Sequence, residues 1–328
     1  MTTFLLSGEF LRTFGEAFEA ACRDAAIEAD VIPLPADPAV ILPPEDVARV
    51  EVAYFSEDIH PRYTRPFFGI TTNAPNLRWM HLMNAGIDSP VFGQLLARGV
   101  RLTTSSGSTA KPIAQTAIGG MLMLARGFPA WSRAQGAREW APVGHPNVPP
   151  DLDGQTMVVV GVGAIGNEIA RLARAIGLHV IGVRRSPGRD WDEVDEMHPP
   201  VELARILPRA YWLALACPLT DETRGMIDAK ALALLPPGAG ILNIARGEVI
   251  DEPALIAALE SGALRGAYLD VFAQEPLPAE SPLWSMPNVI ISPHNSAISA
   301  GNRGRQAEYF FRNLKAFAKG DAMENEVR

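Results

Sequence analysis

Residues 157–166 read MVVVGVGAIG, an apolar run that passes directly into a glycine-rich turn and then into a helical pattern. In this order Gly161 makes the tight turn, Gly163 lets backbone approach a pyrophosphate, and Gly166 lets the helix pack closely on the strand. Ala164 and Ile165 open the helix, whose free N–H groups and partial positive charge attract phosphate. The stretch therefore predicts a dinucleotide site in preference to a purely structural turn.

The region around this turn alternates short apolar runs with helical patterns. Helical spacing follows at 164–176 and again at 252–261, where Gly262 ends the pattern. The expected strands are residues 157–160, 179–183, 211–216, 240–244, 266–270 and 288–291. Six strands joined by crossover helices predict a doubly wound parallel sheet of the Rossmann kind.

The N-terminal part of the chain shows the same alternation. Its expected strands are residues 3–6, 50–55, 78–83 and 100–103, with a helix at 9–22. Prolines at 33, 35, 38, 43 and 44 predict that residues 31–45 form a loop with short extended pieces. The fold class is therefore α/β, with two Rossmann-like or flavodoxin-like domains built on doubly wound parallel sheets.

Two long helical patterns, at 110–126 and 300–317, lie at the boundaries between these blocks. The simplest account is that the chain leaves one lobe on the first helix, builds the second lobe, and returns on the last helix. We expect a discontinuous substrate-binding domain (residues 1–105 plus 298–328) and a dinucleotide-binding domain (residues 106–297). The intervening segment 127–150, rich in proline and aromatic residues, predicts an arm with little regular structure.

The composition favours a small-molecule partner. A net charge of −8 gives no sign of the basic stripe that a nucleic-acid-binding protein needs. Cys22 and Cys217 are too few for a disulfide framework or a cysteine-rich zinc site, and no metal is expected. No basic signal-peptide region opens the sequence, and no apolar stretch approaches the roughly 18 residues of a membrane span. The expected location is the cytoplasm, with no membrane partner.

The end of the second strand bears on the coenzyme. An NAD-binding site of this kind places a carboxylate about 20 residues after the glycine turn, where it binds the ribose hydroxyls. This sequence instead has Arg184, Arg185 and Ser186 there. Guanidinium groups and a hydroxyl suit a 2′-phosphate, so NADP is preferred over NAD, which stays possible. The alternative is a solvated basic turn.

Ionisable residues follow the expected ends of three other strands, where ligands bind in open α/β sheets. Arg246 can hold a carboxylate and polarise a carbonyl, His294 can donate a proton, and Glu275 can keep that donor protonated. Asp270 ends the strand before Glu275. Each has a plainer alternative: a surface turn for Arg246, a hydrogen-bonded core histidine for His294, and a solvated loop acid for Glu275. Together they favour reduction of a 2-keto acid.

The chain resembles the D-2-hydroxy-acid dehydrogenase family, whose members include formate, glycerate and phosphoglycerate dehydrogenases. The resemblance is dense from Leu152 to Ser296: LDGQT (152–156), the glycine turn, PLTDETR (218–224), IARG (244–247), LDVF (269–272), EP (275–276) and PH (293–294). It implies Arg246, Glu275 and His294 as the catalytic set and Asp270 near the nicotinamide carboxamide. It also implies that Pro218 and the Thr223–Arg224 pair contact the cofactor, and that segment 127–150 helps to form a homodimer.

In the first lobe the resemblance is sparser. NAGID (84–88) is similar to the family loop whose backbone N–H groups hold the substrate carboxylate, which makes Ala85 and Gly86 substrate-binding candidates beside Arg246 and His294. Gln115 and Cys217 depart from the family pattern, and Cys217 is interpreted as a packed residue at a strand end.

The family resemblance implies reduction of a small 2-keto acid of the glyoxylate or hydroxypyruvate type to the D-2-hydroxy acid, and the reverse oxidation. One alternative is a dehydrogenase for a bulkier acid, with Trp79, Tyr54 and Phe55 lining a larger apolar pocket. Another is a dinucleotide-sensing corepressor on the same fold. The sequence leaves the substrate side chain and the physiological direction open.

Overall fold

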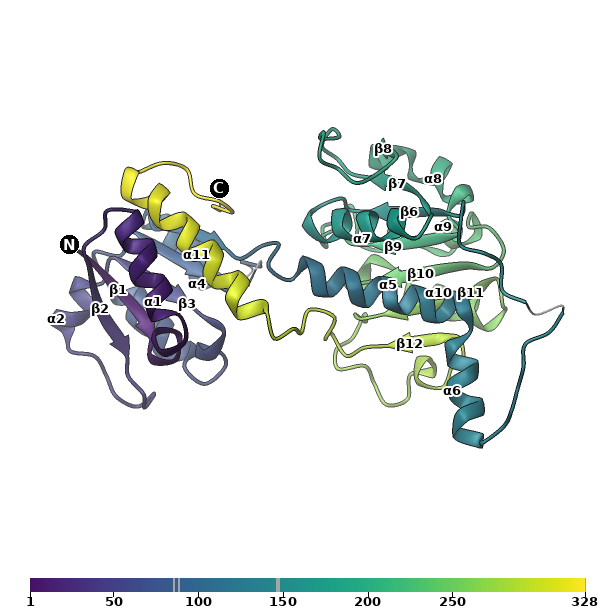
Figure 1. Cartoon of the computed structure of the whole chain (residues 1–328), viewed down its shortest axis with the longest axis horizontal. Coiled ribbons are helices and arrows are strands. Elements are labelled where there is room, and N and C mark those ends of the chain that lie inside the picture. Colours follow the sequence, from purple (N-terminus) through teal and green to yellow (C-terminus); the bar gives the residue numbers. More distant parts are fainter. Residues whose placement is uncertain (85, 88, 146–147, 328) are drawn as a thin grey trace. The chain divides into compact units, whose positions relative to one another are not determined.

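The computed structural model describes residues 1–84, 86–87, 89–145 and 148–327. The chain divides into two compact units, one formed by Met1–Ser108 with Ser299–Arg328 and the other by Thr109–Ile298. Each unit is built on one sheet of parallel strands (Figure 1). The α/β fold class expected from the sequence is confirmed.

The sheet of the first unit has the strand order β2-β1-β3-β4-β5, the flavodoxin-like arrangement. Its strands are β1 (Thr2–Ser7), β2 (Ala29–Leu34), β3 (Val52–Phe55), β4 (Trp79–Leu82) and β5 (Arg101–Thr104). The helices are α1 (Gly8–Asp24), α2 (Pro44–Arg49), α3 (Thr64–Asn73), α4 (Pro90–Ala97) and α11 (Asn302–Lys319). Helices α1 and α11, far apart in the sequence, lie side by side (Figure 1).

Alternate residues of these strands enter two separate cores. Phe4, Tyr54 and Trp79 pack with Phe310 of α11 on one face, whereas Leu5 and its neighbours pack with α3 and α4 on the other. This alternation is what a sheet buried on both faces requires, because successive side chains of a strand point to opposite sides. Trp79, Tyr54 and Phe55 are therefore core residues, so they do not support the interpretation as a larger substrate pocket.

Among the strands and helices of this unit, β2, α2, α3 and α4 are not in the sequence prediction. The proline-rich stretch 31–45, predicted as a loop with short extended pieces, overlaps the end of β2 and the start of the short helix α2. Pro33 is tolerated because β2 lies at the edge of the sheet, where one side of the strand needs no N–H donor. Pro44 occupies the first position of α2, where its missing N–H would be unpaired in any residue.

The sheet of the second unit has the order β12-β11-β10-β9-β6-β7-β8. The strands are β6 (Thr156–Val160), β7 (His179–Val183), β8 (Glu196–His198), β9 (Trp212–Leu215), β10 (Ala239–Asn243), β11 (Leu264–Leu269) and β12 (Val289–Ile291). The order is that of the doubly wound dinucleotide fold extended by β12, and the order in which strands are added to the sheet reverses between β6 and β9. The sequence predicted six of these strands and missed β8.

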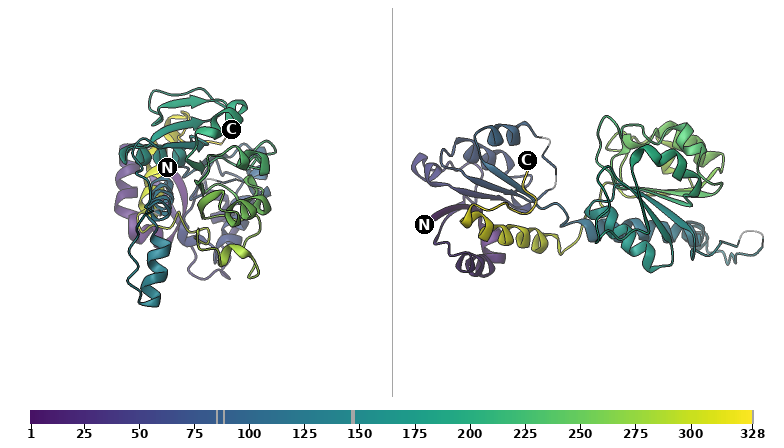
Figure 2. Two further views of the ribbon diagram at one scale, coloured as in Figure 1. Left: turned by 90° about the vertical axis from the view of Figure 1, so that its right-hand side faces the viewer. Right: turned by 90° about the horizontal axis from the view of Figure 1, so that it is seen from above.

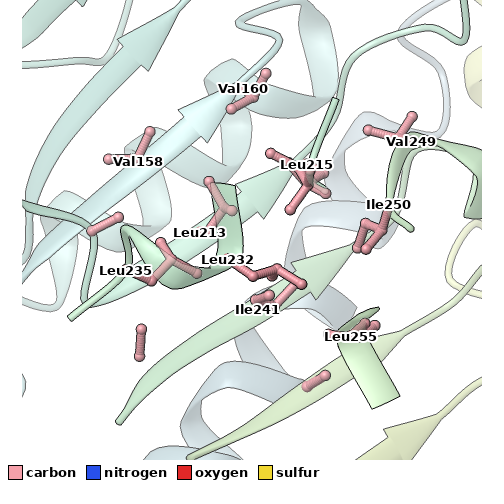
Figure 3. Close-up of a cluster of buried hydrophobic side chains, with 14 of the residues drawn as sticks. Val158, Val160, Leu213, Leu215, Leu232, Leu235, Ile241, Val249, Ile250 and Leu255 are labelled. Carbon is pink, nitrogen blue, oxygen red and sulfur yellow. The ribbon is translucent and has the colours of Figure 1, made fainter. Parts of the chain in front are cut away.

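Helices cover both faces of this second sheet, as Figure 2 shows. Helices α5 (Ala110–Arg126) and α7 (Ala164–Ala175) pack on one face; α8 (Leu203–Ile206), α9 (Ala229–Ala233) and α10 (Glu252–Glu260) lie on the other. Figure 3 shows the core beneath the second group, where Val158, Leu213 and Ile241 of neighbouring strands meet Leu232 and Leu255 of the helices.

Segment 127–150 is more ordered than predicted, because residues Phe128–Ala137 form helix α6. The helix follows Gly127, which has a left-handed backbone conformation, and projects from the second unit (Figures 1 and 2). None of its residues is buried, and Phe128 and Trp131 are 45% and 43% exposed. Within the described ranges, no helix has the length and apolar character needed to cross a bilayer.

Candidate functional site

The glycine turn joins β6 to α7 in the geometry that a dinucleotide requires. Gly161 has φ +96°, and a Cβ there would lie 2.5 Å from the backbone nitrogen of Cys217. A Cβ on Gly166 would overlap the carbonyl oxygen of Gly161. A Cβ on Gly163 would instead meet open space, so packing within the chain does not require glycine here. The open space leaves room for a ligand to approach the backbone closely. Ala164 and Ile165 form the start of α7.

A cavity of about 700 Å³ lies at the carboxyl ends of β6, β7 and β9. This is the point where the strand order reverses, the usual ligand position in open α/β sheets. The predicted residues that line the cavity are Gly161, Gly163, Arg184, Arg185, Ser186, Pro218 and Thr223. The volume lies within the range of small-molecule and cofactor pockets.

The two arginines that follow β7 have different environments in the structure. The Arg184 side chain is only 11% exposed and forms a salt bridge with Asp192. The Arg185 side chain is 73% exposed, and its Nη1 lies 3.7 Å from Glu222. The two arginines therefore cannot have the same function, although the sequence predicted one function for both.

Thr223 and Arg224, both predicted to contact the cofactor, lie on the loop after β9, but only Thr223 is in the cavity lining. Thr223 lines the cavity, but its hydroxyl donates to the carbonyl of Pro218 and accepts from the N–H of Thr220. Arg224 is absent from the cavity lining and lies 3.7 Å from Glu248. Cys217 is buried, and burial raises the pKa of its thiol to about 11, which fits a packed residue rather than a nucleophile.

Arg246, Glu275 and His294 follow the carboxyl ends of β10, β11 and β12, which are neighbours in the sheet. The buried Asn243 shapes the Arg246 turn, since its amide donates to the carbonyl of Arg246 and its oxygen accepts from the N–H of Ala245. The Arg246 side chain donates to the carbonyl of Ala245 at 2.7 Å, and the residue is exposed. Asn243 was missed by the sequence reasoning, although its place at a strand end was a usable signal.

Glu275 and His294 contact each other directly. Oε2 of Glu275 lies 2.8 Å from Nδ1 of His294, and Oε1 accepts from the N–H of Phe272 at 3.1 Å. The carboxylate is thereby fixed on its own loop while it orients the imidazole. Because Nδ1 is occupied, Nε2 is the nitrogen available to a substrate.

Asp270 is more buried than its predicted role near the nicotinamide suggested. It is 2% exposed, and Oδ1 accepts from Ser292 Oγ at 2.5 Å and from the N–H groups of Asn295 and Ser296 at 2.9 and 3.0 Å. Oδ2 accepts from Ser296 Oγ. The backbone carbonyl of Asp270 also accepts the N–H of His294, whose φ is +54°. Asp270 therefore holds the loop that carries the imidazole in an uncommon backbone conformation.

The substrate-loop candidates lie in the first unit, after β4. Gly86 is an exposed loop residue whose carbonyl accepts from the Asn84 amide, whereas Ala85 lies outside the described residues. Their predicted contact with a carboxylate stays a prediction.

Comparison with known proteins shows the family to which the chain belongs. Residues 118–296 match the family described as D-isomer specific 2-hydroxyacid dehydrogenase, NAD binding domain. The glyoxylate reductase of Korarchaeum cryptofilum is 32% identical over 257 residues, which are 77% of each chain. One similar crystal structure is a D-isomer specific 2-hydroxyacid dehydrogenase of Xanthobacter autotrophicus in complex with NADPH and MES (30% identity, TM-score 0.74). Another is an NADPH-dependent glyoxylate/hydroxypyruvate reductase of Sinorhizobium meliloti (28% identity, TM-score 0.73). Each match covers the whole of this chain and 98% of the other chain. The chain belongs to the D-isomer-specific 2-hydroxyacid dehydrogenase family, a family of oxidoreductases with a nicotinamide-dinucleotide-binding domain.

Proposed function

We propose that this protein reduces a small 2-keto acid of the glyoxylate or hydroxypyruvate type to the D-2-hydroxy acid, with NADPH preferred over NADH. The observation that carries the proposal is the contact between His294 Nδ1 and Glu275 Oε2, which lie 2.8 Å apart. The two residues lie on the loops that follow the neighbouring strands β12 and β11, and Arg246 lies on the loop that follows the next strand, β10. The relatives named as glyoxylate reductases, and the Sinorhizobium enzyme named as NADPH-dependent, support the substrate class and the coenzyme.

The second unit fits a nicotinamide dinucleotide. The open space at Gly163 and the cavity beside it can receive a pyrophosphate, and the N-terminus of α7 offers N–H groups to it. A reduced nicotinamide held there supplies the hydride for the reduction. Arg185 and Ser186 at the cavity rim favour a coenzyme with a 2′-phosphate.

Three side chains would perform the rest of the chemistry. The Arg246 guanidinium would bind the keto-acid carboxylate and polarise the adjacent carbonyl. His294 would donate the proton from Nε2 to the carbonyl oxygen as negative charge develops there. Glu275, on Nδ1, would fix the ring orientation and stabilise its charged form. Ala85 and Gly86 of the first unit would supply backbone N–H groups to the substrate carboxylate.

The test is a panel of keto acids of increasing side-chain size, assayed with NADPH and with NADH, followed by chiral chromatography of the product. We expect turnover of the shortest acids, higher kcat/KM with NADPH, and a D product. An L product would refute the proposed substrate pose. Coenzyme binding without turnover of any acid in the panel would favour the sensor function instead.

Two further expectations belong to the same proposal. The exposed aromatic side chains of α6 are too apolar for a solvated helix, which favours a homodimer that covers them. A cytoplasmic location stays a prediction from the sequence.

A further inference from the structure

Every N–H donor of the Arg184 guanidinium is used inside the chain. Nε donates to the carbonyl of Ser186 at 3.2 Å, and Nη1 donates to the carbonyl of Val162 at 2.9 Å and to Asp192 at 3.3 Å. Nη2 donates to Asp192 at 2.8 Å and to the carbonyl of Pro187. An arginine side chain has five N–H donors, so none is left for a phosphate oxygen.

Asp192 is the centre of this arrangement. Its side chain is 3% exposed, and besides Arg184 it accepts from Arg189, through the backbone N–H at 2.7 Å, Nε at 3.1 Å and Nη2 at 2.9 Å. Burial opposes ionisation, but the hydrogen bonds from the two arginines outweigh it and hold the pKa of Asp192 below its usual value. Moving Arg184 to a ligand would take one cation from a buried carboxylate, which is strongly unfavourable.

The two arginines also converge on the glycine turn. The carbonyl of Val162, between Gly161 and Gly163, accepts from Arg184 at 2.9 Å and from Arg189 at 3.2 Å. Val162, Arg184, Arg189 and Asp192, which we call the bracket, thus tie the loop after β7 to the turn that faces the pyrophosphate. Any dinucleotide needs that turn in place, whether or not it carries a 2′-phosphate.

Asp192 also lies close in sequence to the place of an NAD-type ribose ligand, but it cannot serve as one without breaking the bracket. Both of its oxygens are bound by guanidinium groups. Arg185, the neighbour of Arg184, has the opposite character: its side chain is 73% exposed at the cavity rim, with only a distant ion pair to Glu222 among the described residues.

We propose that Arg184 and Asp192 are a positioning pair that holds the glycine turn for both coenzymes, and that Arg185 with Ser186 alone distinguishes NADPH from NADH. The second clause rests on the proposed preference for NADPH; the first does not. The neighbouring arginines therefore have separable functions: one sets the affinity for any dinucleotide, and the other sets the selectivity.

The test compares Arg184→Ala with Arg185→Ala, a matched pair of adjacent substitutions. Dissociation constants for NADPH and NADH are measured by fluorescence titration well below each variant's unfolding temperature. Arg185→Ala should weaken NADPH at least about tenfold, the effect of losing a hydrogen bond to a charged group, and change NADH by less than about twofold. Arg184→Ala should weaken both coenzymes by the same factor.

Three controls make the outcomes decisive. Asp192→Asn should repeat the effect of Arg184→Ala, and the double variant should be no worse than either, as for two residues that act as one unit. If Arg184→Ala does not fold, Arg184→Lys keeps the charge without the planar fork and should also weaken both coenzymes. A loss confined to NADPH in the Arg184 variants would overturn the proposal. Equal affinity of the unmutated protein for both coenzymes would instead refute the NADPH preference and leave the positioning pair intact.

Discussion

Asp270→Asn tests how the His294 loop is held. The substitution keeps the size of the side chain, and the amide oxygen can still accept from Asn295 and Ser296. It removes the negative charge, and the amide nitrogen can no longer accept from the hydroxyl of Ser296. Because His294 has φ +54°, a conformation that is costly for a residue with a Cβ, the loop relaxes if these bonds weaken.

The magnitude follows from the bonds that change. Hydrogen bonds to charged groups contribute about 1.5–3 kcal/mol each and neutral ones about 0.5–1.5, so the variant loses about 1 kcal/mol per retained bond and more at Ser296. Some of this loss is recovered by reorientation of the serine hydroxyls. If the net loss of about 1.5–3 kcal/mol displaces His294 from its position and raises the activation free energy by the same amount, kcat falls by about 10- to 150-fold.

The assay is single-turnover reduction of glyoxylate at saturating NADPH, with coenzyme affinity measured separately. If Asp270 acts through His294, Asp270→Asn should lower the rate but leave NADPH affinity within about threefold, and adding it to His294→Ala should cost nothing more. Asp251→Asn is the matched control, because Asp251 caps α10 and asparagine caps equally well. Additive effects in the double variant, or weaker NADPH binding with an unchanged rate, would refute the reasoning and favour contact with the nicotinamide.

Three other predictions follow from the same structure. His294→Ala should lower the rate of keto-acid reduction by roughly 10²–10⁴-fold, the contribution of a positioned acid. Glu275→Gln should lower it less than about tenfold, because the His294 and Glu275 side chains are 49% and 36% exposed and solvent weakens their interaction. Steady-state kinetics that showed Glu275→Gln to be the more severe variant would contradict this. The protein should be a dimer by light scattering, and replacing Phe128 and Trp131 by serine should give a folded monomer, because α6 has no buried residue; a monomeric parent would exclude the dimer. Burial lowers the pKa of His81 to about 3, so its neutral form is favoured in the fold and the unfolded chain binds the extra proton. The free energy of unfolding should therefore decrease as the pH is lowered from about 6.5 to 3, by at most about 1.4 kcal/mol per pH unit from this group. Urea titrations of His81→Gln should show a free energy of unfolding that depends less on pH over this range.

The sequence predicts the fold best where local pattern and tertiary environment agree. Strands β6, β9 and β10 are continuous apolar runs because both faces of the sheet are covered, and the glycine turn marks the helix that follows β6. Strand β8 was missed because Glu196–His198 carries no apolar run at all. It is an edge strand whose Glu196 accepts hydrogen bonds from Arg209, His198 and His179, contacts that no local pattern announces.

The candidate site shows the same division at the level of single residues. The rule that ligands lie beyond strand ends selects Arg246 and His294 as candidates, because each follows its strand by three residues. It does not indicate what Asn243, Ser292 and Ser296 do, because their contribution is hydrogen bonding across loops. Position in sequence predicts which residues reach the edge of the sheet, but not which of their donors and acceptors are already used there.

Arg184 and Arg185 make that difference concrete. Both follow β7, both are cations, and the sequence offers no reason to separate them. Consecutive residues of an extended chain point to opposite sides, so one guanidinium turns toward Asp192 and Val162 while the other stays exposed at the cavity rim. The decisive partner, Asp192, lies seven and eight residues further on in a turn that no periodic pattern predicts. A count of donors in the folded chain, and not the presence of arginine, therefore decides which side chain can recognise a phosphate.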